Sequence, residues 1–179
     1  MNSIVFIDIE VEPISNRILD IGSIKDNGSS FHSNSISGFI GFLRDTKFIC
    51  GHNILNHDLK YIQKNLVDAG ISQPNIIDTL FLSPLLFPTK PYHHLLKDDK
   101  LQTEELNNPL NDSIKAKDLF FDEIAAFNQT DDSLKQIFYL LLDDKKEFQS
   151  FFDYTSYKSN DSKLEMIIQN TFYSEICSQ

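Results

Sequence analysis

The chain has 179 residues, of which 41% are hydrophobic and 12% aromatic, and its formal net charge is −10. This length supports one domain with a real core, and the composition excludes both a disordered chain and a small disulfide-rich scaffold, since there are only two cysteines. The acidic balance argues against a module that binds nucleic acid through a broad basic surface alone.

The first half of the sequence alternates strand-like and helix-like segments. Residues 4–9 are apolar and β-branched, which predicts a buried strand, and a second strand follows after a turn. Asn27 and Gly28 form a hairpin signal that precedes a short third strand. The remaining elements expected before residue 78 are a helical turn, a strand, a helix that stops at Gly70 and another strand. The predicted strands are residues 4–9, 17–24, 30–33, 47–50 and 75–77, and the predicted helical segments are residues 38–44 and 56–69.

The second half reads as helical. Periodic apolar positions and helix-end signals predict helices at residues 79–87, 110–127 and 133–142. An antiparallel hairpin followed by strand–helix units is typical of a mixed-sheet α/β domain. We therefore expect one domain over residues 1–142. Residues 143–179 are expected to form a helical extension that packs on this domain or leads to a further one.

Asp8 and Glu10 are two acidic residues in the first predicted strand. Side chains two residues apart on a strand point to the same face, so these two carboxylates should project together. Their mutual repulsion is relieved either by solvent, if the strand end faces water, or by a divalent cation. Carboxylate oxygens are hard ligands that suit Mg²⁺ or Mn²⁺.

Two more acidic residues stand where helices begin. Asp58 follows a predicted strand end and opens a helix, and Asp112 lies in the first turn of another. Helix starts favour negative charge, and sheet edges are where sites are usually built. Acids from a strand, a strand end and two helix starts can converge on two metal ions about 3.5–4 Å apart, the arrangement suited to in-line phosphodiester cleavage.

Three segments in this order resemble the motifs of the DEDD superfamily of 3′–5′ exonucleases, which includes polymerase proofreading domains, RNase T and oligoribonuclease. The first is Phe6-Ile7-Asp8-Ile9-Glu10 with the paired segment at residues 18–24, the second runs from Gly51-His52-Asn53 to Asp58, and the third contains Asp112-Ser113. The resemblance spans residues 4–127. It implies a ribonuclease-H-like fold, here an α/β domain with a mixed five-stranded sheet flanked by helices.

The resemblance also implies how the site works. The four acids, Asp8, Glu10, Asp58 and Asp112, would be the catalytic residues and would bind two Mg²⁺ or Mn²⁺ ions. One ion would activate water and the other would stabilise the leaving 3′ oxygen. The substrate would be a single-stranded 3′ end of nucleic acid. The candidate substrate-binding residues are Ile9, His52, Asn53 and His94, although His52 and Asn53 could instead brace the loop before Asp58.

The general base departs from the family pattern. The histidine subfamily places its base five positions before the last Asp, and the tyrosine subfamily places it four positions before. Those positions are Asn107 and Asn108 in this chain. An amide cannot accept a proton from water near neutral pH, so the usual base is missing. His93 or His94 could supply it, or metal activation of water could suffice.

We therefore expect a metal-dependent 3′–5′ exonuclease that hydrolyses single-stranded DNA or RNA ends. The chain could be a module fused to or associated with a helicase or polymerase. The alternative is a catalytically weak exonuclease-like module that binds nucleic acid or a protein. A cytoplasmic location and no membrane partner are expected, since no apolar run reaches membrane-spanning length and no secretory pattern is visible.

Overall fold

The computed structural model describes residues 3–71, 74–95, 108–160 and 163–175. Its centre is one five-stranded sheet in the order β3-β2-β1-β4-β5. β1 pairs antiparallel with β2 and parallel with β4, so the sheet is mixed. The predicted fold class is confirmed: this is an α/β fold with a ribonuclease-H-like arrangement. The strands are β1 (Ile4–Val11), β2 (Ile18–Lys25), β3 (Ser30–His32), β4 (Phe48–Gly51) and β5 (Asn75–Asp78).

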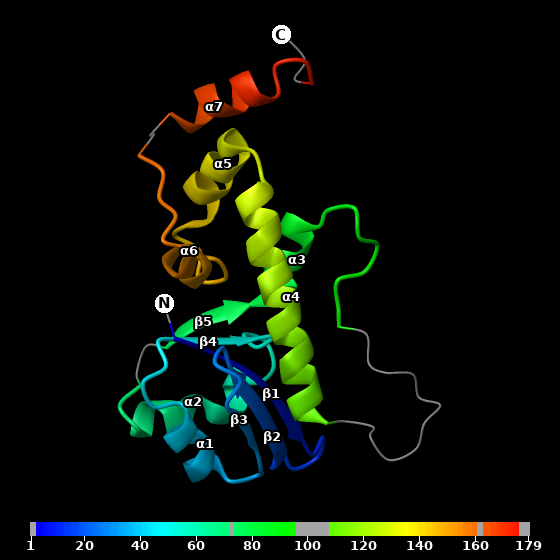
Figure 1. The fold of residues 1–179 in the computed structure, drawn as a ribbon, viewed down its shortest axis with the longest axis vertical. Coiled ribbons are helices and arrows are strands. Elements are labelled where there is room, and N and C mark those ends of the chain that lie inside the picture. Colours follow the sequence, from blue (N-terminus) through cyan, green and yellow to red (C-terminus); the bar gives the residue numbers. More distant parts are fainter. Residues whose placement is uncertain (1–2, 72–73, 96–107, 161–162, 176–179) are drawn as a thin grey trace.

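Helices cover both faces of the sheet in the described part of the chain (Figure 1). The residues of α1 and α2 pack on one face, and those of α3, α4 and α6 pack on the other. α4 is the longest helix and runs across the second face, against β1 and β2. The helices are α1 (Ile36–Phe42), α2 (Leu59–Asp68), α3 (Thr79–Leu86), α4 (Pro109–Gln129), α5 (Asp132–Leu142), α6 (Gln149–Thr155) and α7 (Leu164–Thr171).

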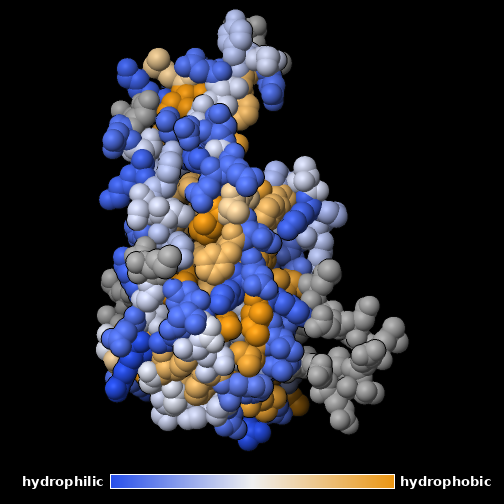
Figure 2. All heavy atoms as spheres, viewed as in Figure 1, coloured by the Kyte–Doolittle hydropathy of each residue, from blue (hydrophilic) through white to orange (hydrophobic). Residues whose placement is uncertain are grey.

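β1 separates two hydrophobic cores because its side chains alternate between the two faces. Val5, Ile7 and Ile9 are buried against α1 and α2, whereas Phe6 is buried against α4. The first core is aliphatic in the main, and the second is built largely from phenylalanine. Figure 2 shows hydrophobic residues gathered along the middle of the face that α4 crosses, with hydrophilic residues around them. Asp8 continues the second face beyond Phe6, so a buried core leads directly into an acidic region.

One helix begins later than the sequence predicts. α2 begins at Leu59, three residues after the predicted start at residue 56. Asn53 has a left-handed backbone with φ of 65°. Its carbonyl accepts the N–H groups of Asn56 and His57, so these residues complete a turn before the helix. Because of this turn, Asp58 is the residue immediately before α2.

The residues after 142 contribute to the second core. Phe151 and Phe152 of α6 are buried there, and the ring of Phe127 in α4 contacts both at centroid distances of 5.1 and 6.2 Å. α7 packs on α5. The division between residues 1–142 and 143–179 stays a prediction. No helix within the described ranges combines the length and apolar character needed to cross a membrane.

Candidate metal centre

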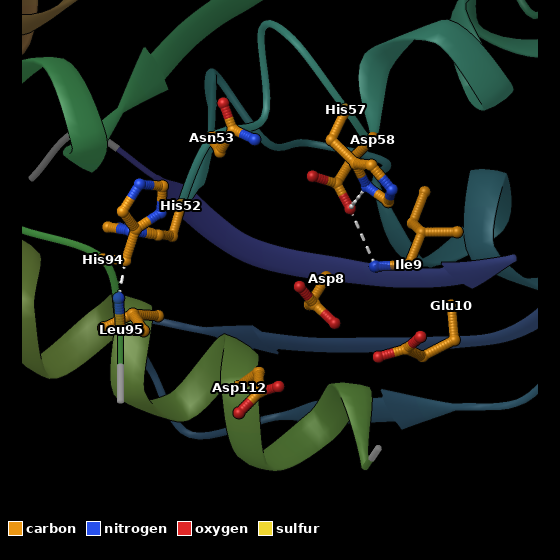
Figure 3. A pocket seen from close by; sticks show the side chains of 10 residues that line it. All are labelled: Asp8, Ile9, Glu10, His52, Asn53, His57, Asp58, His94, Leu95 and Asp112. Carbon is orange, nitrogen blue, oxygen red and sulfur yellow. Dashed lines mark hydrogen bonds and ion pairs between the residues drawn. The ribbon is translucent and has the colours of Figure 1, made fainter. Parts of the chain in front are cut away.

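Three carboxylates meet at the end of β1. Asp8 and Glu10 project from the same face of the strand, and Asp112 approaches them from the first turn of α4 (Figure 3). One oxygen from each of these side chains can be chosen so that all three lie within 4.8 Å of one another. The three residues are partly exposed. Two segments about a hundred residues apart in the sequence therefore bring their acidic groups to one place.

The start of α4 is held by its own capping interactions. The Asn108 side chain accepts hydrogen bonds from the backbone N–H groups of Leu110 and Asn111, at 3.0 and 3.4 Å. Pro109 occupies the first turn, where a missing N–H costs nothing. Asn108 thus serves as the helix cap at the position where the tyrosine subfamily would place its base. Asn107 lies outside the described residues.

Asp58 lies in the same pocket but is held differently from the other three acids. Its side chain is buried, and its Oδ1 accepts a hydrogen bond of 2.8 Å from the backbone N–H of Ile9. In the view of Figure 3, Asp8 lies between Asp58 and Asp112. Asp58 is not part of the group of three that share distances below 4.8 Å. The Ile9 side chain is buried in the first core, so Ile9 meets the pocket through its backbone.

His57, to which no role was assigned from the sequence, lines the pocket beside Asp58. Its Nδ1 is 3.7 Å from Asp58 Oδ1, and its side chain is 44% exposed. Interaction with the Asp58 carboxylate raises the pKa of His57, and the charge of Asp8 acts in the same direction. The only sequence signal was its place directly before Asp58.

Asp78 braces the turn that precedes Asp58. It is fully buried at the end of β5 and accepts three backbone hydrogen bonds, from Asn53 at 2.8 Å, Leu55 at 3.1 Å and Leu80 at 3.0 Å. Burial raises the pKa of Asp78, although these three bonds act in the opposite direction. An Asp directly before a predicted helix is a capping signal that could have identified it. Asn53 lines the pocket and is itself held by Asp78 through its backbone.

His52 links three parts of the structure. Its Nδ1 is 2.9 Å from Thr79 Oγ1, and its Nε2 accepts a hydrogen bond of 3.2 Å from the backbone N–H of Leu95. Because Nε2 accepts, the proton of the neutral ring resides on Nδ1. Burial, followed by the nearby His94, lowers the pKa of His52 to about 4. His52 is therefore a neutral side chain that braces the segment carrying His94, and it also lines the pocket.

His93 and His94 occupy different environments. The Nδ1 of His93 is 2.9 Å from the Oγ of Ser83, a buried residue of α3. His94 lines the pocket, and its ring lies 6.1 Å from that of His52 and 5.3 Å from that of Tyr92. Of the two histidines considered as replacement bases, His94 lines the pocket that contains the acids, and His93 does not.

The pocket provides a volume of about 250 Å³ above the carboxylates. Its donor set fits a hard divalent cation, because the three clustered groups are all carboxylates. Mg²⁺–oxygen bonds of 2.0–2.1 Å place two ligands of one ion up to about 4.2 Å apart, close to the span of the cluster. The lining residues are Asp8, Ile9, Glu10, His52, Asn53, His57, Asp58, His94, Leu95 and Asp112.

Comparisons with known proteins give little beyond this geometry. No family model and no curated protein matches the chain. Among solved structures, the family B DNA polymerase from the hyperthermophilic archaeon Pyrobaculum calidifontis aligns with 97% of this chain and 25% of its own, at 13% identity and a TM-score of 0.39. The chain thus spans a quarter of that polymerase. A likeness this weak adds nothing to the interpretation of the site, which rests on its side chains.

Proposed function

We propose that this chain is a metal-dependent 3′–5′ exonuclease that hydrolyses phosphodiester bonds at single-stranded DNA or RNA ends. The observation that carries the proposal is the convergence of Asp8, Glu10 and Asp112 from β1 and α4, with Asp58 in the same pocket. Like charges held this close repel one another, and Lys115, with its Nζ 3.4 Å from Asp112 Oδ1, supplies one positive charge against three negative ones. The motif order supports an exonuclease over other metal-dependent activities.

Each acid has a defined part in the proposed site. Asp8, Glu10 and Asp112 would hold Mg²⁺ or Mn²⁺ directly. Asp58 would contribute through Oδ2, because its Oδ1 accepts the Ile9 N–H. Two ions bound there would supply an activated water and stabilise the departing 3′ oxygen. The hydrogen bond to Ile9 fixes the Asp58 carboxylate relative to β1, which is the type of support that keeps a ligand in place.

His94 is the residue that we propose to accept the proton from the attacking water, in place of the missing base. It lines the pocket, while His93 is held by Ser83 on α3. A neutral imidazole can accept a proton near neutral pH, whereas an amide cannot. His52 and Asn53 would act chiefly by bracing the pocket walls, through their contacts with Leu95 and Asp78.

The proposal is tested by degradation of single-stranded DNA and RNA labelled at either the 3′ or the 5′ end. Mg²⁺ or Mn²⁺ should release mononucleotides from the 3′ end at once, and EDTA should abolish the release. The 5′ label should remain on progressively shorter products. Asp68→Asn is a matched control, because Asp68 is an exposed acid paired with Lys64 on α2. Its activity should equal that of the wild type.

The alternative is a catalytically weak exonuclease-like module that binds nucleic acid or a protein. The capping role of Asn108 favours it, since this side chain is committed to the start of α4. This alternative replaces the proposal if the wild type binds Mn²⁺ and single-stranded ends but releases no nucleotide with either metal. A fused or associated polymerase or helicase, and a cytoplasmic location, remain proposals of the same kind.

A further inference from the structure

Gly22 lies where β2 passes beneath the start of α4. In the antiparallel register, Gly22 is paired directly with Asp8. A Cβ atom added to Gly22 would lie 2.0 Å from the backbone nitrogen of Leu110 and 2.0 Å from the carbonyl carbon of Pro109. The first turn of α4 therefore packs directly on the backbone of Gly22. This contact lies beside Asp8 of the cluster, and Leu110 precedes Asp112 by two residues.

The reason for glycine here is space. Gly28 and Gly70 have positive φ, but Gly22 does not, so its backbone is open to any residue. The atoms that a side chain would meet belong to the backbone, and real Cβ contacts stay above 3.0 Å. Any side chain at position 22 must therefore move α4 away from β2 by about 1 Å or more, because the helix backbone cannot rotate aside as a side chain can.

That movement would act on the carboxylate cluster. Asp112 follows Leu110 by two residues on α4, while Asp8 is fixed in the strand beside Gly22. Mg²⁺ requires oxygens at 2.0–2.1 Å in nearly ideal octahedral geometry, so a shift of about 1 Å removes a ligand from its place.

We propose that Gly22 is a positioning residue of the metal centre: its missing side chain sets the distance between Asp112 on α4 and the Asp8–Glu10 pair on β1. The proposal rests on the proposed function for its metal. It assigns Gly22 no contact with metal or substrate.

Gly22→Ala should weaken Mn²⁺ binding by about 10–100-fold, the range seen when support of a ligand is lost. Binding is measured by titration calorimetry and by the electron paramagnetic resonance signal of free Mn²⁺. Gly41→Ala is the matched control, since a Cβ at Gly41 in α1 meets nothing within 4 Å. It should bind Mn²⁺ as the wild type does. Wild-type affinity in a folded Gly22→Ala protein would overturn the proposal.

A longer acid separates a positioning role from general damage to the fold. Asp112→Glu extends the carboxylate by about 1.5 Å, the length of one C–C bond. Alone it should overreach and weaken Mn²⁺ binding by about tenfold or more, whereas in the Gly22→Ala background it should restore part of the lost affinity. Additive losses in the double variant would overturn the proposal. If Gly22→Ala does not fold, Asp112→Glu alone decides: unchanged affinity would show that the spacing is not set tightly.

The two proposals can fail separately. Mn²⁺ binding that follows this pattern without nuclease activity would remove the proposed function and leave the role of Gly22 intact. If the wild type binds no Mn²⁺, a crystal structure of Gly22→Ala decides instead. A first turn of α4 displaced from β1 by about 1 Å or more supports the spacing role, and an unmoved turn overturns it.

Discussion

α4 carries two acidic residues whose surroundings are opposite. Asp112, in the first turn, faces a solvated pocket and shares it with Asp8 and Glu10. Glu123, three turns further on, has no exposed surface, and neither of its carboxylate oxygens has a hydrogen-bond partner. Burial, followed by the charge of Asp78, raises the pKa of Glu123 to about 9. One helix thus holds one acid in a charged cluster and another as a neutral group in a core.

The two acids show two ways in which the unfavourable charge of a carboxylate is neutralised. A buried acid without a partner is neutralised by a proton, because ionisation in an apolar environment is unfavourable. A cluster of acids open to solvent can instead be neutralised by a cation that enters from outside. Only the second arrangement leaves the charge available for chemistry. The acidic site at Asp112 is therefore the candidate for function, and Glu123 is a cost to stability.

The largest expected effect comes from removing one acid of the open cluster. Asp8→Asn should reduce metal-dependent hydrolysis by more than about 10⁴-fold, because the amide no longer supplies the charged ligand on which metal activation depends. Thermal stability should be retained or raised, since one of three repelling groups is lost. Nuclease assays and thermal denaturation without metal check both parts. Activity within tenfold of the wild type would contradict the assignment of function to the open cluster.

The next effect concerns the missing base at the open cluster. If Asn107 occupies the general-base position, Asn107→His should raise the rate by as much as 10²–10⁴-fold. The gain should appear as pH rises through roughly 6.5, where histidine loses its proton.

Two further variants identify the base. If His94 already accepts the proton, Asn107→His should do little and His94→Ala should cost a comparable factor. His93→Ala is the matched control, because His93 is held by Ser83. Rate–pH profiles of the three variants decide between the two residues. If no variant changes the rate, metal activation alone is sufficient.

Glu123 should give a smaller effect, on stability. Between pH 4.5, the ordinary pKa of Glu, and pH 9 the unfolded chain releases the Glu123 proton while the folded protein keeps it. Stability therefore falls as pH rises across this window, by up to about 1.4 kcal/mol per pH unit. Glu123→Met removes the titrating group and fills similar space. It should raise the free energy of unfolding by up to about 5 kcal/mol at pH 8 and by less than about 1 kcal/mol at pH 5.

Urea denaturation at pH 5 and pH 8 measures this difference. Glu123→Gln should also lose the pH dependence, but it keeps a buried amide without a partner and should gain less than the Met variant. Glu165→Gln, at an exposed position of α7, is the control and should change neither value. Equal gains for Glu123→Met at both pH values would contradict a proton-neutralised carboxyl group.

Much of the fold could be predicted because it depends on local pattern. Apolar β-branched residues identified β1, and helix-end signals came within a few residues of α3, α4 and α5. α2 was less well predicted, since its start depends on the left-handed backbone of Asn53, which no periodicity shows. The mixed character of the sheet also followed from general rules, because hairpins pair antiparallel and strand–helix units pair parallel.

The residues of the site also differ in whether the local sequence pattern predicts them. The acids Asp8, Glu10 and Asp112 stood out because charge interrupts an apolar strand or opens a helix. The residues that hold them did not, because support depends on contacts between distant segments: Gly22 with Leu110, and Asp78 with Asn53. Glu123 falls on the buried stripe of α4 between Phe120 and Phe127, and this spacing is a local signal of burial. Its neighbour Asp122 is exposed, so two adjacent acids of α4 have opposite surroundings.

The smallest expected effect tests how the open pocket is held in shape, and it concerns His52. Its two nitrogens make separate contacts, Nδ1 with Thr79 and Nε2 with the backbone of Leu95. The amide of Asn can replace Nδ1, and that of the longer Gln can replace Nε2. His52→Gln should therefore keep the segment that carries His94, whereas His52→Asn should release it. The ratio of their rates should be about tenfold, the worth of one hydrogen bond.

Acid stability provides a second measurement on the same two variants. The pKa of His52 is lowered to about 4. Below pH 6.5, His52 of the unfolded chain therefore binds a proton, whereas His52 of the folded protein stays neutral until about pH 4. This loss of stability on acidification between about pH 6.5 and 4 should disappear equally in both variants, since neither amide titrates. Equal stability profiles with unequal rates would place the role of His52 in positioning His94. Equal rates would mean that the Leu95 contact serves the fold alone, and the open pocket would then owe its shape to Asp78 and the start of α4.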